Sequence, residues 1–303
     1  MTDDRWGEVL KMALLTRLPI GRPCQTSVVF MTTSRKSGMP LYELQFSEEL
    51  DVRQAPKPKT TILIASTPRS GSHMLGHSML ETDRLGRPFE YCNPVNLDEW
   101  KRRLGLTDTH AVMRELMARR TTPNGIFSVK MHFEHLEVLG GLERVLELFP
   151  DVRVVRIVRS DVVRQAVSLA IAQQTGVWIS GQGNSGAEAT YSYWQIRRAL
   201  DQLLSDNYEW SKALRGAGIS PMTVEFDEVR SNTTGVIRNI AEHAGVDAST
   251  LTTVQSPPTR KQSTPRSDDW CGRFLEQDAK LKNLQRGVER IYSKFVLPRR
   301  ANA

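Results

Sequence analysis

The sequence has 303 residues, of which 39% are hydrophobic and 25% are charged, and its formal net charge is +7. This composition is typical of a soluble globular protein, and the absence of any run of 18 apolar residues argues against a membrane span. The basic residues are dispersed and accompany no nucleic-acid motif, which argues against nucleic-acid binding. The positive charge leaves open a basic solvated surface and the attraction of a polyanionic donor, an acidic acceptor or a membrane face. The three cysteines lie far apart without a CxxC pair, which argues against a disulfide framework and predicts a cytoplasmic location.

Residues 1–59 form a predicted N-terminal extension to which the sequence assigns no role. Residues 28–33 and 41–46 are expected to pair as a β-hairpin around a turn that contains Gly and Pro. Residues 54–59 alternate proline with lysine, which predicts a linker. A dimer arm, a membrane-surface segment and a disordered tail all remain open for this extension.

From residue 60 onward, strands alternate with helices. Ser160 is expected to cap one helix and Gly176 to end it, and Ser185-Gly-Ala-Glu188 has the form of a capping box that opens a long helix. The alternation predicts a three-layer, P-loop-like α/β domain over residues 60–296, in which helices flank a parallel sheet. The predicted strands are 61–66, 126–130, 152–158 and 221–226, and the predicted helices are about 72–83, 133–148, 160–175, 188–214, 234–244 and 268–292.

The segment 61–75 carries the clearest functional signal. Its apolar strand leads through Thr67-Pro-Arg-Ser-Gly-Ser72 into the start of a helix, an arrangement that binds phosphate with backbone N–H groups and the helix dipole. Against the GxxxxGK[ST] nucleotide loop, Ser72 replaces the lysine and His73 replaces the magnesium-binding hydroxyl. Arg69 lies inside the loop instead. The loop therefore predicts a site for one phosphate and a group leaving it, without a metal.

This loop resembles the 5′-phosphosulfate loop of sulfotransferases, which use 3′-phosphoadenosine 5′-phosphosulfate (PAPS) as donor. Within that superfamily, the chain is most similar to bacterial carbohydrate sulfotransferases of the trehalose 2-sulfotransferase and nodulation-factor type, over residues 60 to about 280. The resemblance is specific because five anchors occur in the same order: STPRSGS at 66–72, GRPFE at 86–90, TPNG at 122–125 leading to Lys130, RSDVVRQAVS at 159–168, and RSDDW at 266–270.

The resemblance implies that the loop holds the 5′-phosphate of PAPS. Arg69 is expected to contact both this phosphate and the bridging oxygen, with Ser70, Gly71 and Ser72 supplying further hydrogen bonds. Relatives commonly carry threonine where this chain has His73. A protonated imidazole at this position would make PAPS affinity depend on pH between about 6 and 8.

The resemblance also implies a second set of residues for the 3′-phosphate. Arg159 ends a predicted strand, where open α/β sheets bind ligands, and Ser168 lies in the helix that follows. Arg164 stands nearby and adds positive charge. Arg266 corresponds to a loop arginine that closes over the 3′-phosphate.

Two residues compete as the general base that deprotonates the acceptor. Glu90 aligns with the carboxylate assigned as base in the trehalose-type enzymes, whereas His132 matches the K-x-H spacing of cytosolic eukaryotic sulfotransferases. Either side chain can accept a proton from a hydroxyl. We favour Glu90, because the other anchors point to the bacterial branch, and His132 stays the alternative. Lys130 is expected to neutralise the transferring sulfonate.

No metal is expected, because the histidine pairs His73/His77 and His132/His135 lack organised further ligands. The resemblance implies a carbohydrate or glycolipid acceptor, whose identity and reacting hydroxyl the motifs do not encode. It leaves a monomer and a homodimer open, and also association of a cytoplasmic enzyme with a membrane surface. The alternative functions are a non-catalytic nucleotide-binding member of the fold and a P-loop kinase, the latter opposed by the missing loop lysine.

Overall fold

The structure is a computed structural model that describes residues 42–178, 188–251 and 265–295. The described residues belong to two compact units. The first takes its residues from the ranges Met1–Val158 and Gln202–Pro257, and the second from Arg159–Asp201 and Pro258–Ala303.

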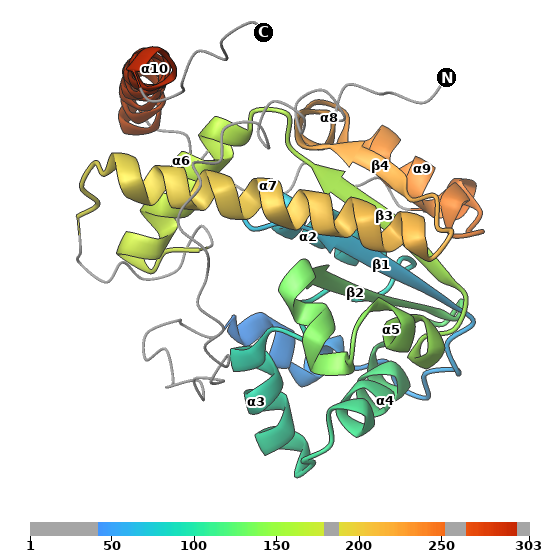
Figure 1. The fold of residues 1–303 in the computed structure, drawn as a ribbon. Coiled ribbons are helices and arrows are strands. Elements are labelled where there is room, and N and C mark those ends of the chain that lie inside the picture. Colours follow the sequence, from blue (N-terminus) through green and yellow to red (C-terminus); the bar gives the residue numbers. More distant parts are fainter. Residues whose placement is uncertain (1–41, 179–187, 252–264, 296–303) are drawn as a thin grey trace, which may run out of the picture. The chain divides into compact units, whose positions relative to one another are not determined.

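A four-stranded sheet organises the first unit, with the strand order β2–β1–β3–β4 (Figure 1). All neighbouring strands run parallel, as the sequence predicted. The strands lie where they were expected, except that β2 continues two residues beyond Lys130. They are β1 (Thr60–Ser66), β2 (Ile126–His132), β3 (Val152–Val158) and β4 (Met222–Glu225).

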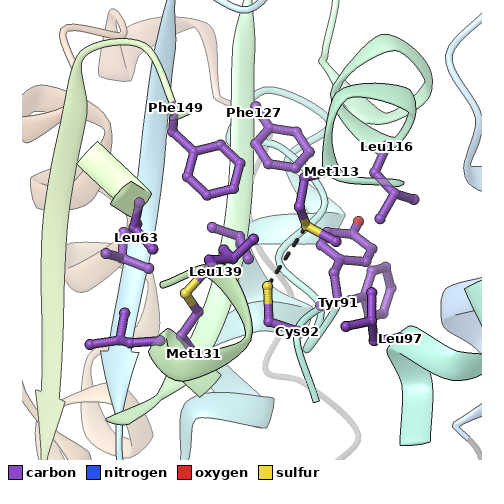
Figure 2. Close-up of a cluster of buried hydrophobic side chains, with 14 of the residues drawn as sticks. Leu63, Tyr91, Cys92, Leu97, Met113, Leu116, Phe127, Met131, Leu139 and Phe149 are labelled. Carbon is purple, nitrogen blue, oxygen red and sulfur yellow. Dashed lines mark hydrogen bonds between the residues drawn. The ribbon is translucent and has the colours of Figure 1, made fainter. Parts of the chain in front are cut away.

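Both faces of this sheet are buried. In β1, Ile62 and Ile64 enter one hydrophobic cluster while Leu63 and Ala65 enter the other, because successive side chains of a strand point to opposite faces. Figure 2 shows part of the second cluster, where Phe127 and its neighbours pack beneath helices. Two buried faces confirm the predicted three-layer α/β architecture.

Helices cover each face of the sheet in the first unit. One face packs against α2 (Ser72–Glu81), α8 (Phe226–Ser231) and α9 (Thr233–His243), which a short 3₁₀ helix, η4 (Ala248–Thr250), follows. The other face packs against α3 (Pro94–Leu104), α4 (Thr109–Arg120), α5 (Leu142–Leu148) and the C-terminal part of α7 (Tyr193–Gly216). Helices α3 and α4 were not predicted.

The single helix predicted over 133–148 is wrong, because the chain forms a 3₁₀ helix, η3 (Phe133–Leu139), and then α5. Between them Gly140 and Gly141 have φ values of +87° and +98°. This left-handed backbone region is readily open to glycine alone, and it interrupts helical hydrogen bonding. The hydrophobic periodicity of residues 133–148 therefore does not reveal that the helix is interrupted at Gly140 and Gly141.

The hairpin expected in the N-terminal extension is also wrong in its second strand. Residues of that strand form a 3₁₀ helix, η1 (Glu43–Phe46), and a second one, η2 (Glu48–Leu50), follows. The first predicted strand, 28–33, lies outside the described residues. Phe46 is buried against Trp100 of α3, with ring centroids 5.0 Å apart, so packing on the domain replaces pairing within a hairpin.

A buried ion pair ties this segment to α4. The side chain of Arg120 is 1% exposed, and its Nε lies 2.8 Å from Oδ1 of Asp51. The same guanidinium donates a hydrogen bond to the carbonyl oxygen of Ser47 at 3.0 Å. Residues 42–51 therefore contribute to the core of the first unit.

The second unit is helical. Helix α6 (Val162–Thr175) begins after Asp161, whose carboxylate accepts a hydrogen bond from the Arg164 amide, so Asp161 replaces Ser160 as the cap. The helix ends at Gly176, as predicted. Helix α10 (Pro265–Phe295) and the start of α7 complete the unit, and Tyr193 of α7 stacks on Phe274 of α10.

Helix α7 begins at Tyr193, later than the start that the capping box at 185–188 predicted, and residues 185–187 of that box lie outside the described residues. No helix in the described ranges combines the length and the apolar character that crossing a membrane requires.

Candidate active site

The phosphate loop joins β1 to α2, and its backbone makes a tight turn. Arg69 and Gly71 both have positive φ values, +63° and +91°. A Cβ atom added to Gly71 would lie 2.7 Å from Cε2 of Phe226, so only glycine allows this close approach of α8. A left-handed arginine is uncommon, and such strain concentrates at functional sites. The predicted strand–loop–helix arrangement is confirmed.

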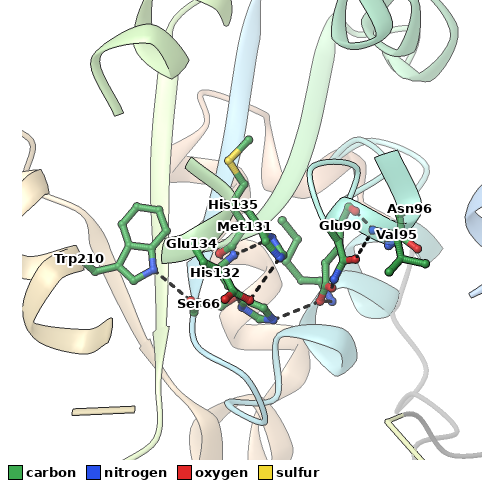
Figure 3. Close-up of polar contacts among 11 residues, drawn as sticks. Ser66, Glu90, Val95, Asn96, Met131, His132, Glu134, His135 and Trp210 are labelled. Carbon is green, nitrogen blue, oxygen red and sulfur yellow. Dashed lines mark hydrogen bonds and ion pairs between the residues drawn. The ribbon is translucent and has the colours of Figure 1, made fainter. Parts of the chain in front are cut away.

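The neighbouring strand brings three predicted residues together. Lys130 donates its backbone N–H to the carbonyl oxygen of Phe89 at 3.0 Å, which extends the sheet by a single bridge and places Glu90 beside β2. Lys130 Nζ then lies 2.9 Å from Glu90 Oε1. His132 Nε2 lies 3.4 Å from the same oxygen (Figure 3). Lys130 and His132 therefore contact the same carboxylate oxygen of Glu90, so the two candidate bases lie in direct contact with each other.

Three residues that sequence reasoning did not assign hold the His132 ring in place. Ser66 Oγ lies 3.1 Å from His132 Nδ1, because the register of β1 and β2 pairs these two residues. The Trp210 indole N–H donates to the carbonyl oxygen of Ser66 at 3.0 Å, and His135 Nδ1 accepts the backbone N–H of His132 at 3.1 Å (Figure 3). The contacts of Ser66 and Trp210 arise from sheet register and tertiary packing, which no local motif encodes, whereas the His135 contact is local and lies at the start of η3.

The carboxylate of Glu90 is ionised at neutral pH. Burial raises its pKa, but the positive charge of Lys130 and the interaction with His132, including its hydrogen bond, outweigh this effect and hold the pKa well below the usual range. The side chain of Glu90 is 23% exposed and that of Lys130 is 6% exposed. A nearly buried ion pair of this kind needs both partners, since either charge alone would be left poorly solvated.

His73 occupies the first turn of α2, directly after the loop. Burial, together with the charge of Lys130, lowers the pKa of His73 to about 2. Because burial and a neighbouring cation both favour the neutral imidazole, the free protein does not favour the protonated imidazole that the sequence suggested, and its role toward the donor stays a prediction.

The residues expected at the 3′-phosphate lie in the second unit. Arg159 directly follows β3, Ser168 lies within α6, and Arg266 is an exposed residue in the first turn of α10. Arg164 forms ion pairs with Asp161 and with Asp268 of α10.

The described residues contain no group of three or more His, Cys, Asp or Glu side chains arranged to hold a metal ion.

Comparison with known proteins identifies the family. The family model described as Stf0 sulphotransferase matches residues 61–277. The trehalose 2-sulfotransferase of Mycobacterium tuberculosis is 24% identical over 258 residues, which are 72% of this chain and 96% of that protein. The enzyme of the same name from Mycolicibacterium smegmatis is 26% identical over 255 residues, covering 71% of this chain and 94% of that protein.

Among solved structures, a sulfotransferase from Alicyclobacillus acidocaldarius aligns with a TM-score of 0.45 at 14% identity. The alignment covers 76% of this chain and 96% of that one. Because the family model spans well over half of the sequence and includes the phosphate loop, Glu90 and Lys130, the chain belongs to the Stf0 sulphotransferase family.

Proposed function

We propose that this sulfotransferase moves the sulfonate group of PAPS onto a hydroxyl of a small carbohydrate, with Glu90 as general base. The observation that carries the proposal is the Lys130–Glu90–His132 cluster at the carboxyl end of β2. This cluster lies beside the end of β1, from which the phosphate loop departs, because Ser66 and His132 are paired in the sheet. Open α/β sheets bind ligands at this edge.

Three residues of the first unit are proposed to carry out separate parts of the reaction. The acceptor oxygen forms a bond to sulfur while the bond between sulfur and the bridging oxygen breaks, and 3′,5′-bisphosphoadenosine (PAP) leaves with the electron pair. The hydroxyl proton passes to Glu90. Lys130 neutralises the sulfonate in transit, and Arg69 stabilises the charge that develops on the departing phosphate.

The Lys130–Glu90 ion pair also controls the basicity of Glu90. While Lys130 is paired with the carboxylate, Glu90 is ionised and has a low affinity for a proton. When a sulfonate shares the Lys130 ammonium, this stabilisation of the carboxylate falls and its proton affinity rises. The base therefore strengthens when the donor is bound.

Arg159, Ser168 and Arg266 are proposed to hold the 3′-phosphate, which distinguishes PAPS from other adenine nucleotides. We expect PAP to bind at least 100-fold more tightly than AMP, and Arg159→Ala to remove most of this preference, because a charge-assisted guanidinium–phosphate contact is lost. Calorimetry with both ligands measures the ratio. Arg153→Ala, which removes an exposed arginine of β3, is the matched control and should leave the ratio unchanged. Equal binding of PAP and AMP to the native protein would refute the PAPS assignment.

His73→Thr tests how the loop–helix junction contacts the donor. Because His73 is neutral in the free protein, we expect the variant to change PAP affinity by the same factor at pH 6 and at pH 8. Calorimetry at both pH values with native protein and variant gives the two factors. A factor that grows more than threefold toward acid pH would show that His73 binds the ligand as a cation.

Trehalose is the first acceptor to assay, since two relatives that match along nearly their whole length are named trehalose 2-sulfotransferases. Transfer of labelled sulfonate from PAPS to trehalose, to other disaccharides and to glycolipids identifies the acceptor. Four expectations stay predictions: a cytoplasmic location, association with a membrane surface, a homodimer, and an N-terminal extension that ends at residue 59.

A further inference from the structure

Tyr42 precedes the segment that the family model matches, yet it contacts three residues next to the phosphate loop. Its hydroxyl lies 2.7 Å from Nε2 of His77. Its ring meets His73 edge-on with centroids 5.0 Å apart, and it lies 6.0 Å from the ring of Phe89. His73 and His77 themselves meet at 4.4 Å. We call Tyr42, His73, His77 and Phe89 the aromatic wall.

The aromatic wall adjoins the groups that carry out the transfer. His73 is the second residue of α2 and follows the phosphate loop directly. Phe89 immediately precedes Glu90, and its carbonyl oxygen accepts the backbone N–H of Lys130. The charges of Lys130, Glu90 and Arg69 all act on His73. A change in the aromatic wall therefore changes the surroundings of Lys130, Glu90 and Arg69.

The wall keeps its polar members uncharged. Burial lowers the pKa of both His73 and His77, and burial raises the pKa of Tyr42 to about 12, so the phenol keeps its proton. The titratable or charged groups facing His73 are His77 from α2, Tyr42 from the preceding segment, Lys130 from β2, Glu90 and Arg69. A neutral imidazole in these surroundings offers one N–H and one acceptor nitrogen, whereas an imidazolium would offer two N–H groups and a charge.

We propose that Tyr42 is a positioning residue for the reaction, which closes the aromatic wall and thereby holds the His73 ring out of water beside the phosphate loop. The segment before the family domain is then part of the active site of this chain. Of the two measurements that test this proposal, histidine titration and PAP binding, only PAP binding rests on the proposed function.

Histidine titration by long-range ¹H–¹⁵N NMR tests the proposal without any ligand. The chain has six histidines, and His73→Thr assigns the signal of interest. In the native protein, His73 should remain neutral between pH 8 and pH 5. In Tyr42→Ala, water should reach the ring, and His73 should titrate with a midpoint above pH 5. Tyr208→Ala removes an exposed tyrosine of α7 and should behave like the native protein.

The second arm measures PAP binding by calorimetry as a function of pH. The ratio of the Tyr42→Ala affinity to the native affinity cancels the ionisation of the ligand phosphates. We expect this ratio to rise three- to tenfold between pH 8 and pH 5.5, because the variant gains a cation beside the loop. A native protein that does not bind PAP would refute the proposed function, while the titration of His73 would still decide the role of Tyr42.

Tyr42→Phe guards against a variant that fails to fold, since it keeps the ring and removes only the hydroxyl that contacts His77. This variant should shift the tautomer population of His77 while His73 stays neutral. The proposal is overturned if His73 titrates alike in the native protein and in Tyr42→Ala, or if the His77 signals of Tyr42→Phe equal the native ones.

Discussion

Glu90→Gln is expected to lower kcat for sulfonate transfer by about 10²–10⁴-fold, the usual loss when a general base is removed. Glutamine has nearly the same shape, and its amide oxygen still accepts a hydrogen bond from Lys130, so the site should keep its geometry. The affinity for PAP should therefore change less than threefold. Single-turnover transfer of labelled sulfonate measures the chemical step, and calorimetry measures binding.

His132→Gln is the matched control, because His132 contacts the same oxygen of Glu90 as Lys130 does. If Glu90 is the base, His132 only orients it, and this variant should lose about tenfold or less in kcat. The reverse pattern, a large loss in His132→Gln and a small loss in Glu90→Gln, would make His132 the base.

The pH profile gives a second criterion. Since Lys130 and His132 hold the pKa of Glu90 well below its usual range, the carboxylate stays ionised as the pH falls to 5. With Glu90 as base, kcat/KM for PAPS, which reports the free enzyme and the free donor, should therefore show no acid limb between pH 5 and pH 8 beyond the one that ionisation of the donor phosphates gives to PAP binding. A fall of kcat/KM that exceeds the fall in PAP affinity over the same window would contradict the assignment.

The parallel sheet could be predicted from the sequence because its strands carry their own signal. Residues 152–158 are dominated by valine and isoleucine, and β3 spans these residues. The loop between β1 and α2 was predictable for a different reason. Gly71 has a left-handed conformation and lies close to Phe226, so the position requires glycine. A requirement for one residue type at one position is visible in a local sequence motif.

Helices α3 and α4 show where local interpretation stops. Asn93 and Pro94 begin α3, and Asp108 begins α4, all with side chains suited to helix starts. These signals were present, but Asn, Asp and Pro also favour turns, so a capping residue alone does not predict the helix that follows it. The pattern over 133–148 failed in the opposite way, since periodicity continued across Gly140 and Gly141.

The candidate site was predictable in its residue types but not in its contacts. Glu90 and His132 were alternatives because each matches the base of a different sulfotransferase branch, and the sequence did not show that they touch. The bridge between Phe89 and Val129 brings them to one place. The support from Ser66 and Trp210 depends on strand register and on how α7 packs against the end of β1. Such long-range contacts have no counterpart in the spacing of a motif.

Lys130→Met is expected to reduce both stability and activity. Methionine fills a similar volume but leaves the Glu90 carboxylate without its ammonium partner. Removing one partner of a buried pair typically costs about 3–5 kcal/mol, and the partial exposure of Glu90 favours the lower end, so the melting temperature should fall by about 10 °C. Loss of the cation that stabilises the sulfonate should also lower kcat/KM by about 10³-fold.

The dependence of this instability on pH identifies its cause. In the native protein the pKa of Glu90 is depressed on folding, so its contribution to stability is complete above the unfolded value of about 4.3 and is lost as the pH falls below it. Without Lys130, burial dominates and raises the pKa, so the variant should regain stability on acidification. The gap in melting temperature should therefore be widest at pH 7–8 and should narrow toward pH 5.

The double variant Lys130→Met/Glu90→Gln separates the stabilising role of the ion pair from its chemical role. Removing both charges relieves the unpaired carboxylate, so stability at pH 7 should return most of the way to the native value. Activity should be at least as low as in Glu90→Gln, because the cation is missing in addition to the base. A double variant as unstable as Lys130→Met would instead show that the loss comes from side-chain packing around Lys130, and the pH dependence would then be absent as well.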